Sequence, residues 1–288
     1  MLMGTMATVS KLEAGRLRDR YRRASEAIGE AAERSGRHAS SVLSLAVTDE
    51  ATPDQIRQLV QLGHQDLAEH NLAQLPQRAL QLQEFLGRQR FLERFRPTAD
   101  GEVNAVAVPA SRPVRWHLVG PVQRGKLKPI IAHVKLIHSV CNLRVAEELH
   151  AFASRQDERR AEQARAGTPS DQPPEPIDVL LQVNTTSNPE LPGVAPAAAV
   201  HLAGQIDTMM HLRLRGVAGT GEPAEDEQAI GLAFARCAGI FEDIRTAKIG
   251  GEGFAILAMG QDRRLATAIG HGANMVRLAD ALFGSGNI

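Results

Sequence analysis

The sequence predicts a single (β/α)8 barrel of the TIM type preceded by an N-terminal helix. Two observations support this fold class: eight short apolar segments alternate with helix-forming segments, and 288 residues are enough for one such barrel. An open doubly wound sheet would give the same alternation, because periodicity alone does not show closure. No Gly-x-Gly-x-x-Gly motif follows the first strand, which disfavours the dinucleotide-binding form of that alternative.

The first two elements have local signals of their own. A charged, helix-prone segment spans about residues 10–37, and apolar side chains such as Leu17 and Tyr21 recur on one of its faces. A glycine at position 36 is expected to end this helix. The apolar run 42–47 predicts the first strand, and Pro53 after it favours a helix start, because the fixed φ of proline suits the first helical turn.

The other elements follow from the same alternation. Strands are expected near residues 42–47, 64–67, 114–119, 134–140, 177–184, 213–218, 253–258 and 274–278. Helices are expected at residues 53–62, 71–90, 123–132, 143–163, 195–209, 225–246 and 262–271.

Two segments, about 92–113 and 154–176, are interpreted as insertions. The first is rich in arginine, proline and alanine, and the second ends in a proline-dense stretch. Such composition favours a solvated, poorly ordered loop. Neither segment resembles a domain boundary, so we expect one domain over residues 10–284.

Composition narrows the class of protein. The chain has 33 basic and 33 acidic residues, so no net field attracts nucleic acid or an anionic membrane. Its two cysteines, Cys141 and Cys237, lie far apart without metal-ligand spacing, which is typical of a reducing compartment. No apolar run reaches the roughly 18–20 residues of a membrane helix, and no secretory signal is evident. We expect a cytoplasmic protein.

The predicted strand ends carry the residues able to do chemistry, because reactive groups of such barrels lie where strands end. This set includes both acids and imidazoles. Its members are Thr48-Asp49-Glu50, Glu69-His70-Asn71, His117, His138-Ser139, Asn184-Thr185-Thr186, Ala218-Gly219-Thr220, Ala258-Met259-Gly260 and Arg277. Polar loop residues occur in any barrel, so each one alone is weak support for a site.

Three motifs resemble a known family. They are the segment Trp116 to Lys126 (WHLVGPVQRGK), LAVTD at 45–49 and LAMG at 257–260. Together they resemble the pyridoxal-phosphate homeostasis proteins, single-domain relatives of the alanine racemase fold-type III barrel. The resemblance covers roughly residues 10–284. It implies a role in vitamin B6 and amino-acid balance, with no secure enzymatic reaction.

The departures from the family concentrate where it holds its cofactor. Asp49 stands at the position of the lysine that forms a Schiff base with pyridoxal phosphate, and a carboxylate cannot form an imine. His70, Ala218, Ala258, Asp262 and Ala279 are also replacements, whereas Met259, Gly260 and Arg277 match. The resemblance therefore implies a family member with a degenerate cofactor site. Matches such as Trp116, Gly216, Phe283 and Gly284 suit packing and turns.

The expected losses of binding free energy indicate that pyridoxal phosphate is at most a weak, non-covalent ligand. The resemblance places its phosphate on the loops after strands seven and eight. Loss of two serine hydroxyls there costs about 1.5–3 kcal/mol each. Repulsion by Asp49 adds about 4 kcal/mol at roughly 8 Å and a dielectric near 20. Together these losses exceed the difference of roughly 4 kcal/mol in binding free energy between a micromolar and a millimolar site. Arg277 recovers part of this if it turns inward; otherwise it anchors the outer layer.

Four lysines lie within the expected barrel, Lys126, Lys128, Lys135 and Lys248. Lys126 and Lys128 fall on the short helix expected after strand three. Reach from that helix to the barrel mouth would be strained, so an alternative Schiff base is not the favoured interpretation.

Three functions stay open on the sequence alone. The first is a binding or regulatory protein with a degenerate pyridoxal-phosphate site and a small phosphorylated ligand. The second is a repurposed barrel enzyme that uses Asp49, His70 and His117 as acid–base groups or as metal ligands. No recognised metal motif is present, so we expect no metal. The third is a non-catalytic partner of a lysine-bearing paralogue, recognised through segments 92–113 and 154–176.

Overall fold

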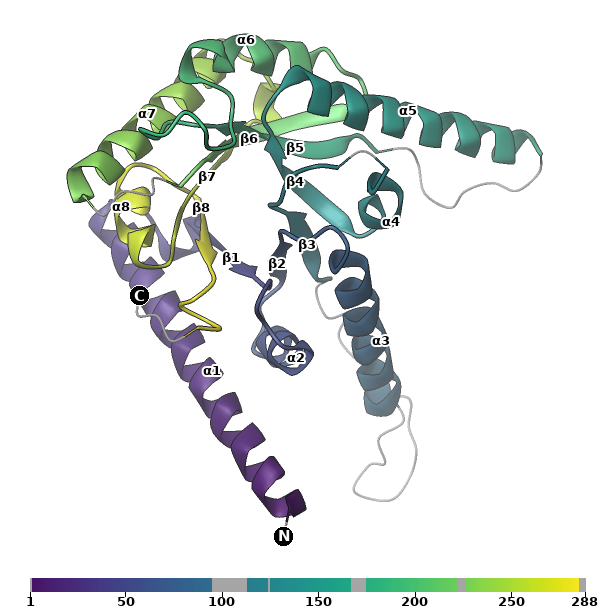
Figure 1. Cartoon of the computed structure of the whole chain (residues 1–288), viewed down its shortest axis with the longest axis vertical. Coiled ribbons are helices and arrows are strands. Elements are labelled where there is room, and N and C mark those ends of the chain that lie inside the picture. Colours follow the sequence, from purple (N-terminus) through teal and green to yellow (C-terminus); the bar gives the residue numbers. More distant parts are fainter. Residues whose placement is uncertain (1, 95–112, 124, 167–174, 222–225, 285–288) are drawn as a thin grey trace.

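The chain forms a closed barrel of eight parallel strands surrounded by helices (Figure 1). A computed structural model describes residues 2–94, 113–123, 125–166, 175–221 and 226–284, with the backbone alone for residues 2–14, 93 and 94. The strands pair in chain order, and β8 pairs back with β1, with Leu43 opposite Met275 and Leu45 opposite Arg277. The predicted (β/α)8 barrel is confirmed, and the open doubly wound alternative is wrong.

The strands and helices have the following bounds. The strands are β1 (Leu43–Val47), β2 (Asp66–Glu69), β3 (Arg115–Leu118), β4 (Val134–Val140), β5 (Ile177–Val183), β6 (Leu212–Gly219), β7 (Ile256–Gln261) and β8 (Met275–Leu278). The helices are α1 (Leu2–Arg34), α2 (Pro53–Gln61), α3 (Leu75–Arg94), α4 (Leu127–Ile131), α5 (Leu143–Arg165), α6 (Pro196–Asp207), α7 (Glu227–Thr246) and α8 (Leu265–Gly270).

The first helix begins earlier than predicted, at Leu2, α4 begins later, at Leu127, and β7 is displaced toward the C-terminus, to Ile256–Gln261. Turn chemistry explains three further differences. β2 begins two residues later than expected, after Gly63 ends the preceding turn with φ +96°. α3 begins at Leu75 rather than at residue 71, because Asn71 forms a turn in which its side chain accepts the N–H of Ala73 at 2.9 Å. The last helix is shortened because Asp262 adopts φ +48° and α8 begins only at Leu265.

Two apolar layers hold the barrel together. The inner layer fills the barrel itself and includes Leu45, Ala68, Leu180, Ala218, Ala258 and Met275. The outer layer lies between the sheet and the helices. Arg37, which follows α1, donates to the carbonyl of Ile269 in α8 at 2.6 Å and to that of Ala273 beyond α8 at 2.9 Å, so it ties the end of α1 to the last helix. Along each strand, side chains alternate between these two layers, and this alternation determines which residues face the interior.

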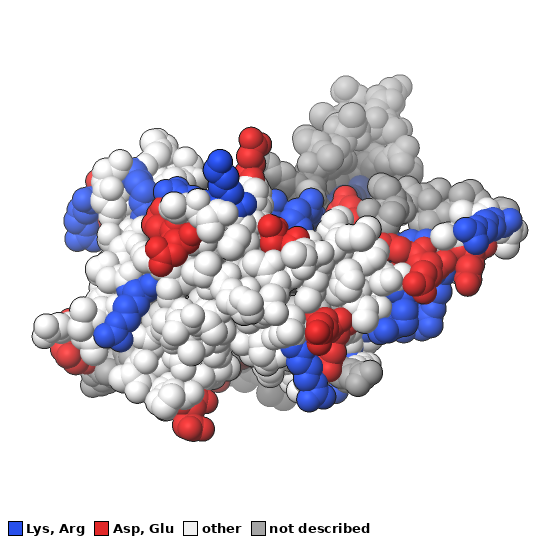
Figure 2. All heavy atoms as spheres, turned by 90° about the horizontal axis from the view of Figure 1, so that it is seen from above, with Lys and Arg blue, Asp and Glu red and all other residues white. Residues whose placement is uncertain are grey.

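Charge is mixed on the outside of the molecule. On the face shown in Figure 2, acidic and basic side chains are interspersed rather than gathered by sign. Among the described residues, no helix combines the length and apolar character needed to cross a membrane. Of the two expected insertions, residues 95–112 and 167–174 lie outside the described residues.

Truncation of an inner-layer side chain should destabilise the barrel. Leu180 is fully buried, whereas Leu232 on α7 is 52% exposed. We expect Leu180→Ala to lower the free energy of unfolding by about 2–5 kcal/mol, because it leaves a cavity that neighbours cannot fill. Leu232→Ala, the matched control, should change it by about 0.5 kcal/mol or less. Urea denaturation followed by circular dichroism measures both, and equal effects would contradict the assigned layers.

Candidate functional site

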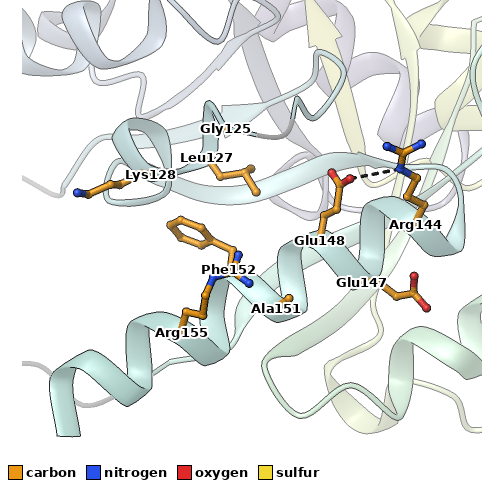
Figure 3. A pocket seen from close by; sticks show the side chains of 9 residues that line it. All are labelled: Gly125, Leu127, Lys128, Arg144, Glu147, Glu148, Ala151, Phe152 and Arg155. Atoms are coloured by element: carbon orange, nitrogen blue, oxygen red, sulfur yellow. Dashed lines mark hydrogen bonds and ion pairs between the residues drawn. The ribbon is translucent and has the colours of Figure 1, made fainter. Parts of the chain in front are cut away.

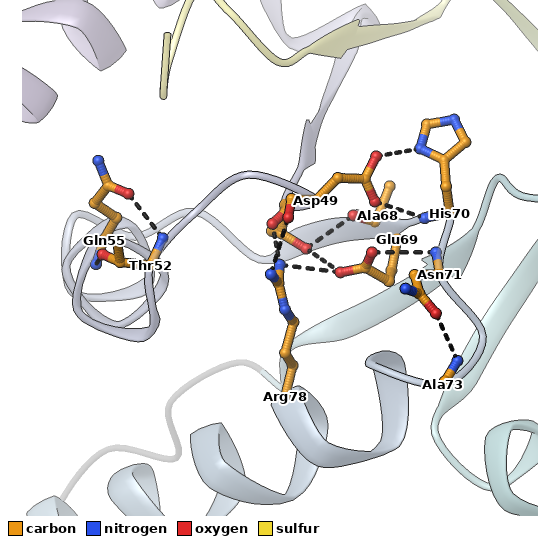
Figure 4. Close-up of polar contacts among 10 residues, drawn as sticks. Asp49, Thr52, Gln55, Ala68, Glu69, His70, Asn71, Ala73 and Arg78 are labelled. Atoms are coloured by element: carbon orange, nitrogen blue, oxygen red, sulfur yellow. Dashed lines mark hydrogen bonds and ion pairs between the residues drawn. The ribbon is translucent and has the colours of Figure 1, made fainter.

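The loops after β1 and β2 bring two of the predicted site residues into contact. Asp49 follows β1, and its carboxylate accepts the backbone N–H of His70 at 2.9 Å. The same carboxylate is hydrogen-bonded to Nδ1 of the His70 ring (Figure 4). The Asp49 side chain is 33% exposed and that of His70 46% exposed. An acid and an imidazole therefore meet at the C-terminal face of the barrel, as adjacent parallel strands require.

His70 also stabilises the ionised form of the Asp49 carboxyl. Burial pushes the pKa of the Asp49 carboxyl upward, but hydrogen bonds from the His70 ring and contact with Glu69 outweigh it, and the pKa falls below its ordinary value. Gly120 of the loop after β3 lies against His70. A Cβ at position 120 would stand 2.0 Å from the carbonyl oxygen of His70, so only glycine permits this close approach.

A buried carboxylate anchors both loops from below. Glu69 is fully buried and accepts from the hydroxyl of Thr48 at 3.1 Å, the N–H of Asn71 at 3.2 Å and Nη1 of Arg78 at 3.0 Å. Arg78 reaches in from α3 and also donates to the backbone carbonyls of Thr48 and Asp49 (Figure 4). Sequence reasoning missed Arg78, because nothing in a helix sequence tells which arginine packs against a neighbouring strand end.

Glu69 is poised to titrate near neutral pH. Burial, followed by the neighbouring Asp49 carboxyl, raises the pKa of Glu69 to about 7, while the Arg78 guanidinium opposes this shift. The pair Asp49 and Glu69 thus holds one firmly ionised carboxylate and one carboxyl that is readily protonated.

His117 belongs to a separate network inside the barrel. Its Nε2 lies 3.2 Å from Oδ1 of Asp66, and its Nδ1 lies 3.0 Å from Nε2 of His138. Asp66 is held in turn by a two-point contact with Arg115, at 2.6 and 2.5 Å. Burial raises the pKa of Asp66, but its bonds to His117 and Arg115 dominate and lower it to about 2. The predicted set of Asp49, His70 and His117 is therefore divided between two networks.

His138 is the inner end of this network. Burial, then the charges of His117 and Arg277, lowers its pKa well below the ordinary value, so the ring is neutral at pH 7. Its Nε2 faces His117, whereas its Nδ1 is buried and has no hydrogen-bond partner among the described residues. An ionised Asp66 accepts a hydrogen bond from Nε2 of His117.

Arg277 points into the barrel. It lies between Met275 and Ala279, which face the inner layer, whereas Val276 and Leu278 face the helices. Its Nε is buried and has no hydrogen-bond partner among the described residues. Burial lowers its pKa to about 10, so the guanidinium stays charged at pH 7. The inward orientation, rather than an anchoring role in the outer layer, is the one that the strand imposes.

The remaining predicted residues are apolar or turn-forming. Ala218 and Ala258 pair across β6 and β7 and pack in the inner layer, while Met259 points outward into the helix layer. Gly260 has φ +85°, and a Cβ there would lie 2.3 Å from that of Ala268. Ala279 lies at the edge of the inner layer. None of their side chains offers a polar group to a ligand.

Asp262 is a second carboxylate at the C-terminal face of the barrel. Its carboxylate accepts the backbone N–H groups of Ala279 at 2.8 Å, Asp280 at 3.3 Å and Ala281 at 3.1 Å. The sequence marked position 262 as a replacement but gave no signal of these contacts, because they depend on its left-handed backbone.

The described residues contain no group of three or more His, Cys, Asp or Glu side chains placed to hold a metal ion. A surface pocket of about 510 Å³ lies outside the barrel between α4 and α5 (Figure 3). It is lined by Leu127, Lys128 and Phe152, among others, and its Arg144 pairs with Glu148 at 3.3 Å. None of the predicted site residues lines this pocket, so its size does not make it the functional site.

Comparison with known proteins finds relatives that match almost the whole chain. No family model matches the chain. The chain is 32% identical over 258 residues to the pyridoxal phosphate homeostasis protein of Pseudomonas aeruginosa, covering 90% of both. It is 25% identical over 257 residues to that of Vibrio cholerae, covering 89% of this chain and 91% of the relative.

Solved structures share the fold. An unknown protein from Bifidobacterium adolescentis matches with TM-score 0.73 and 25% identity, over 94% of this chain and 96% of that one. PipY of Synechococcus elongatus, solved with PLP bound, matches with TM-score 0.60 and 21% identity, over 89% of this chain and all of that one (100%).

The raised pKa of Glu69 predicts a pH-dependent stability. The folded state binds a proton more tightly than the unfolded chain, so this stabilisation is fully present below the ordinary pKa of 4.5 and is lost as pH rises through about 7. We expect the difference in unfolding free energy between the wild type and Glu69→Gln to change by on the order of 2 kcal/mol across this window. Urea denaturation at several pH values measures it, and a difference independent of pH would refute the shift.

Proposed function

The chain belongs to the pyridoxal phosphate homeostasis protein family, and from this premise we propose that it serves vitamin B6 and amino-acid balance as a binding or regulatory protein rather than as a catalyst. The observation that carries the proposal is the hydrogen-bonded contact of Asp49, after β1, with His70, after β2. It stands where the resemblance expects the amine that captures the coenzyme aldehyde. On this proposal residues 10–284 are one domain, and the protein acts in the cytoplasm without nucleic acid.

Among the residues with described side chains, no lysine amine is placed to replace Asp49. Lys126, Lys128, Lys135 and Lys248 are all exposed, and Lys135 pairs with Glu175 at 3.8 Å. Arg277 points into the barrel interior, and a guanidinium does not form an imine. The residues present therefore do not fit a covalently held coenzyme.

The rest of the site supports at most weak, non-covalent binding of pyridoxal phosphate. Ala218, Ala258 and Ala279 offer no hydroxyl donor to a phosphate, and Asp49 places a negative charge at the same face. Arg277 is the inward cation that offsets part of this loss. A small phosphorylated ligand is thus retained in the proposal only as a weak one.

A second candidate, a repurposed enzyme, is favoured by one observation. The Asp49 carboxylate orients an imidazole that is 46% exposed, which is the usual relation between an orienting acid and a general base. His117 has no part in this candidate, because it is buried against Asp66 and His138. A partnership with a lysine-bearing paralogue through segments 92–113 and 154–176 is a third possibility, and most of these segments lies outside the described residues.

Substitution of Asp49 by lysine tests the proposal. We expect wild-type protein incubated with pyridoxal phosphate and then borohydride to carry no label within the barrel interior. Asp49→Lys should gain a label at position 49, because the amine of lysine forms an imine that borohydride fixes. Peptide mass mapping measures the site of labelling.

The matched control is Glu50→Lys, which makes the same charge change on an exposed neighbour. It should be labelled no more than other surface lysines. A wild-type protein labelled stoichiometrically at one lysine would contradict the proposal.

A further inference from the structure

Three backbone N–H groups converge on one carboxylate at the C-terminal face. We call the N–H groups of Ala279, Asp280 and Ala281 the β8 nest. Asp262 takes all three at 2.8–3.3 Å, and its Oδ2 also accepts from Nε2 of Gln261 at 3.3 Å. The carboxylate is half-buried. An oriented cluster of N–H groups of this kind is an anion-binding concavity.

The backbone after β7 is shaped to deliver this carboxylate. Gly260 has φ +85° and packs against Ala268, and Asp262 has φ +48°. A residue other than glycine with such a φ is uncommon, although aspartate tolerates it better than most. The conformation persists where surrounding contacts enforce it, and here those contacts include the β8 nest itself. β7 and β8 are adjacent strands, so the contact joins the loops of neighbouring strands.

A ligand phosphate would need the same donors. In barrels of this architecture, phosphate groups are frequently held by the loops after strands seven and eight. Asp262 follows β7 and the β8 nest follows β8, so the carboxylate stands where such a phosphate would bind. The N–H groups cannot serve both anions in full, and the two negative charges would repel each other.

We propose that Asp262 is a built-in occupant of the β8 nest, and that it weakens the binding of a 5′-phosphorylated form of vitamin B6 at this face. The ligand class rests on the proposed function, whereas the occupancy of the nest rests on the hydrogen bonds alone. Asp262 is then the residue that sets specificity against phosphorylated compounds.

Direct binding to the wild-type protein tests the specificity. Pyridoxine and pyridoxine 5′-phosphate are suitable probes, because neither has an aldehyde that reacts with lysines. Titration calorimetry should show that the wild type binds pyridoxine at least as tightly as its phosphate. In Asp262→Ser the preference should shift toward the phosphate by about tenfold or more, because the nest is freed and gains a hydroxyl donor. Asp207→Ser, an exposed site on α6, is the control and should not shift.

Inorganic phosphate tests the nest without reference to function. It should bind Asp262→Ser and raise its unfolding temperature more than that of the wild type or Asp207→Ser. If folded Asp262→Ser gains no phosphate binding, or if the wild type prefers pyridoxine 5′-phosphate by about tenfold, the proposal is overturned. The wild-type comparison stands even where the variant does not fold. If neither protein binds pyridoxine but Asp262→Ser gains phosphate, the nest assignment holds and the proposed function is lost.

Discussion

Pairing of β1 with β8 is the constraint on which the rest of the structure depends. It closes the barrel and sets the first strand beside the last, with Leu45 opposite Arg277. The loops after β7, β8, β1 and β2 therefore become consecutive around one face. Asp262, the β8 nest, Asp49 and His70 lie on those loops, so groups from both ends of the sequence share one site only because the sheet closes.

Within that site, the chain supplies hydrogen-bond donors to the carboxylates of Asp49 and Asp262. The Asp49 carboxylate is bonded to His70, and the Asp262 carboxylate is bonded to the β8 nest. The family resemblance places a lysine at position 49 and a phosphate-binding serine at position 262. Asp49 and Asp262 stand at these positions, and each carboxylate accepts hydrogen bonds from this chain, so neither needs a coenzyme as its partner. Buried polar groups need such partners, and a scaffold that supplies them keeps its stability when a ligand is lost.

The sequence was sufficient for the architecture and for part of the site. Alternating apolar segments predicted the eight strands, and the strand-end rule placed Asp49 near His70, as the structure shows. It could not separate His117 from that pair. His117 pairs with the inward-facing Ala68 and contacts Asp66 and His138 inside the barrel, and hydrophobic periodicity does not reveal such cross-strand partners. The contacts of Asp262 were equally hidden, since they require a left-handed backbone at a residue that usually avoids it.

The most direct test of the account is native mass spectrometry of the protein isolated from its host, before and after borohydride treatment. We expect that no phosphorylated coenzyme stays attached when the borohydride-treated protein is denatured. A stoichiometric mass gain equal to the reduced coenzyme, surviving denaturation, would show that an amine and a phosphate site persist and would contradict it.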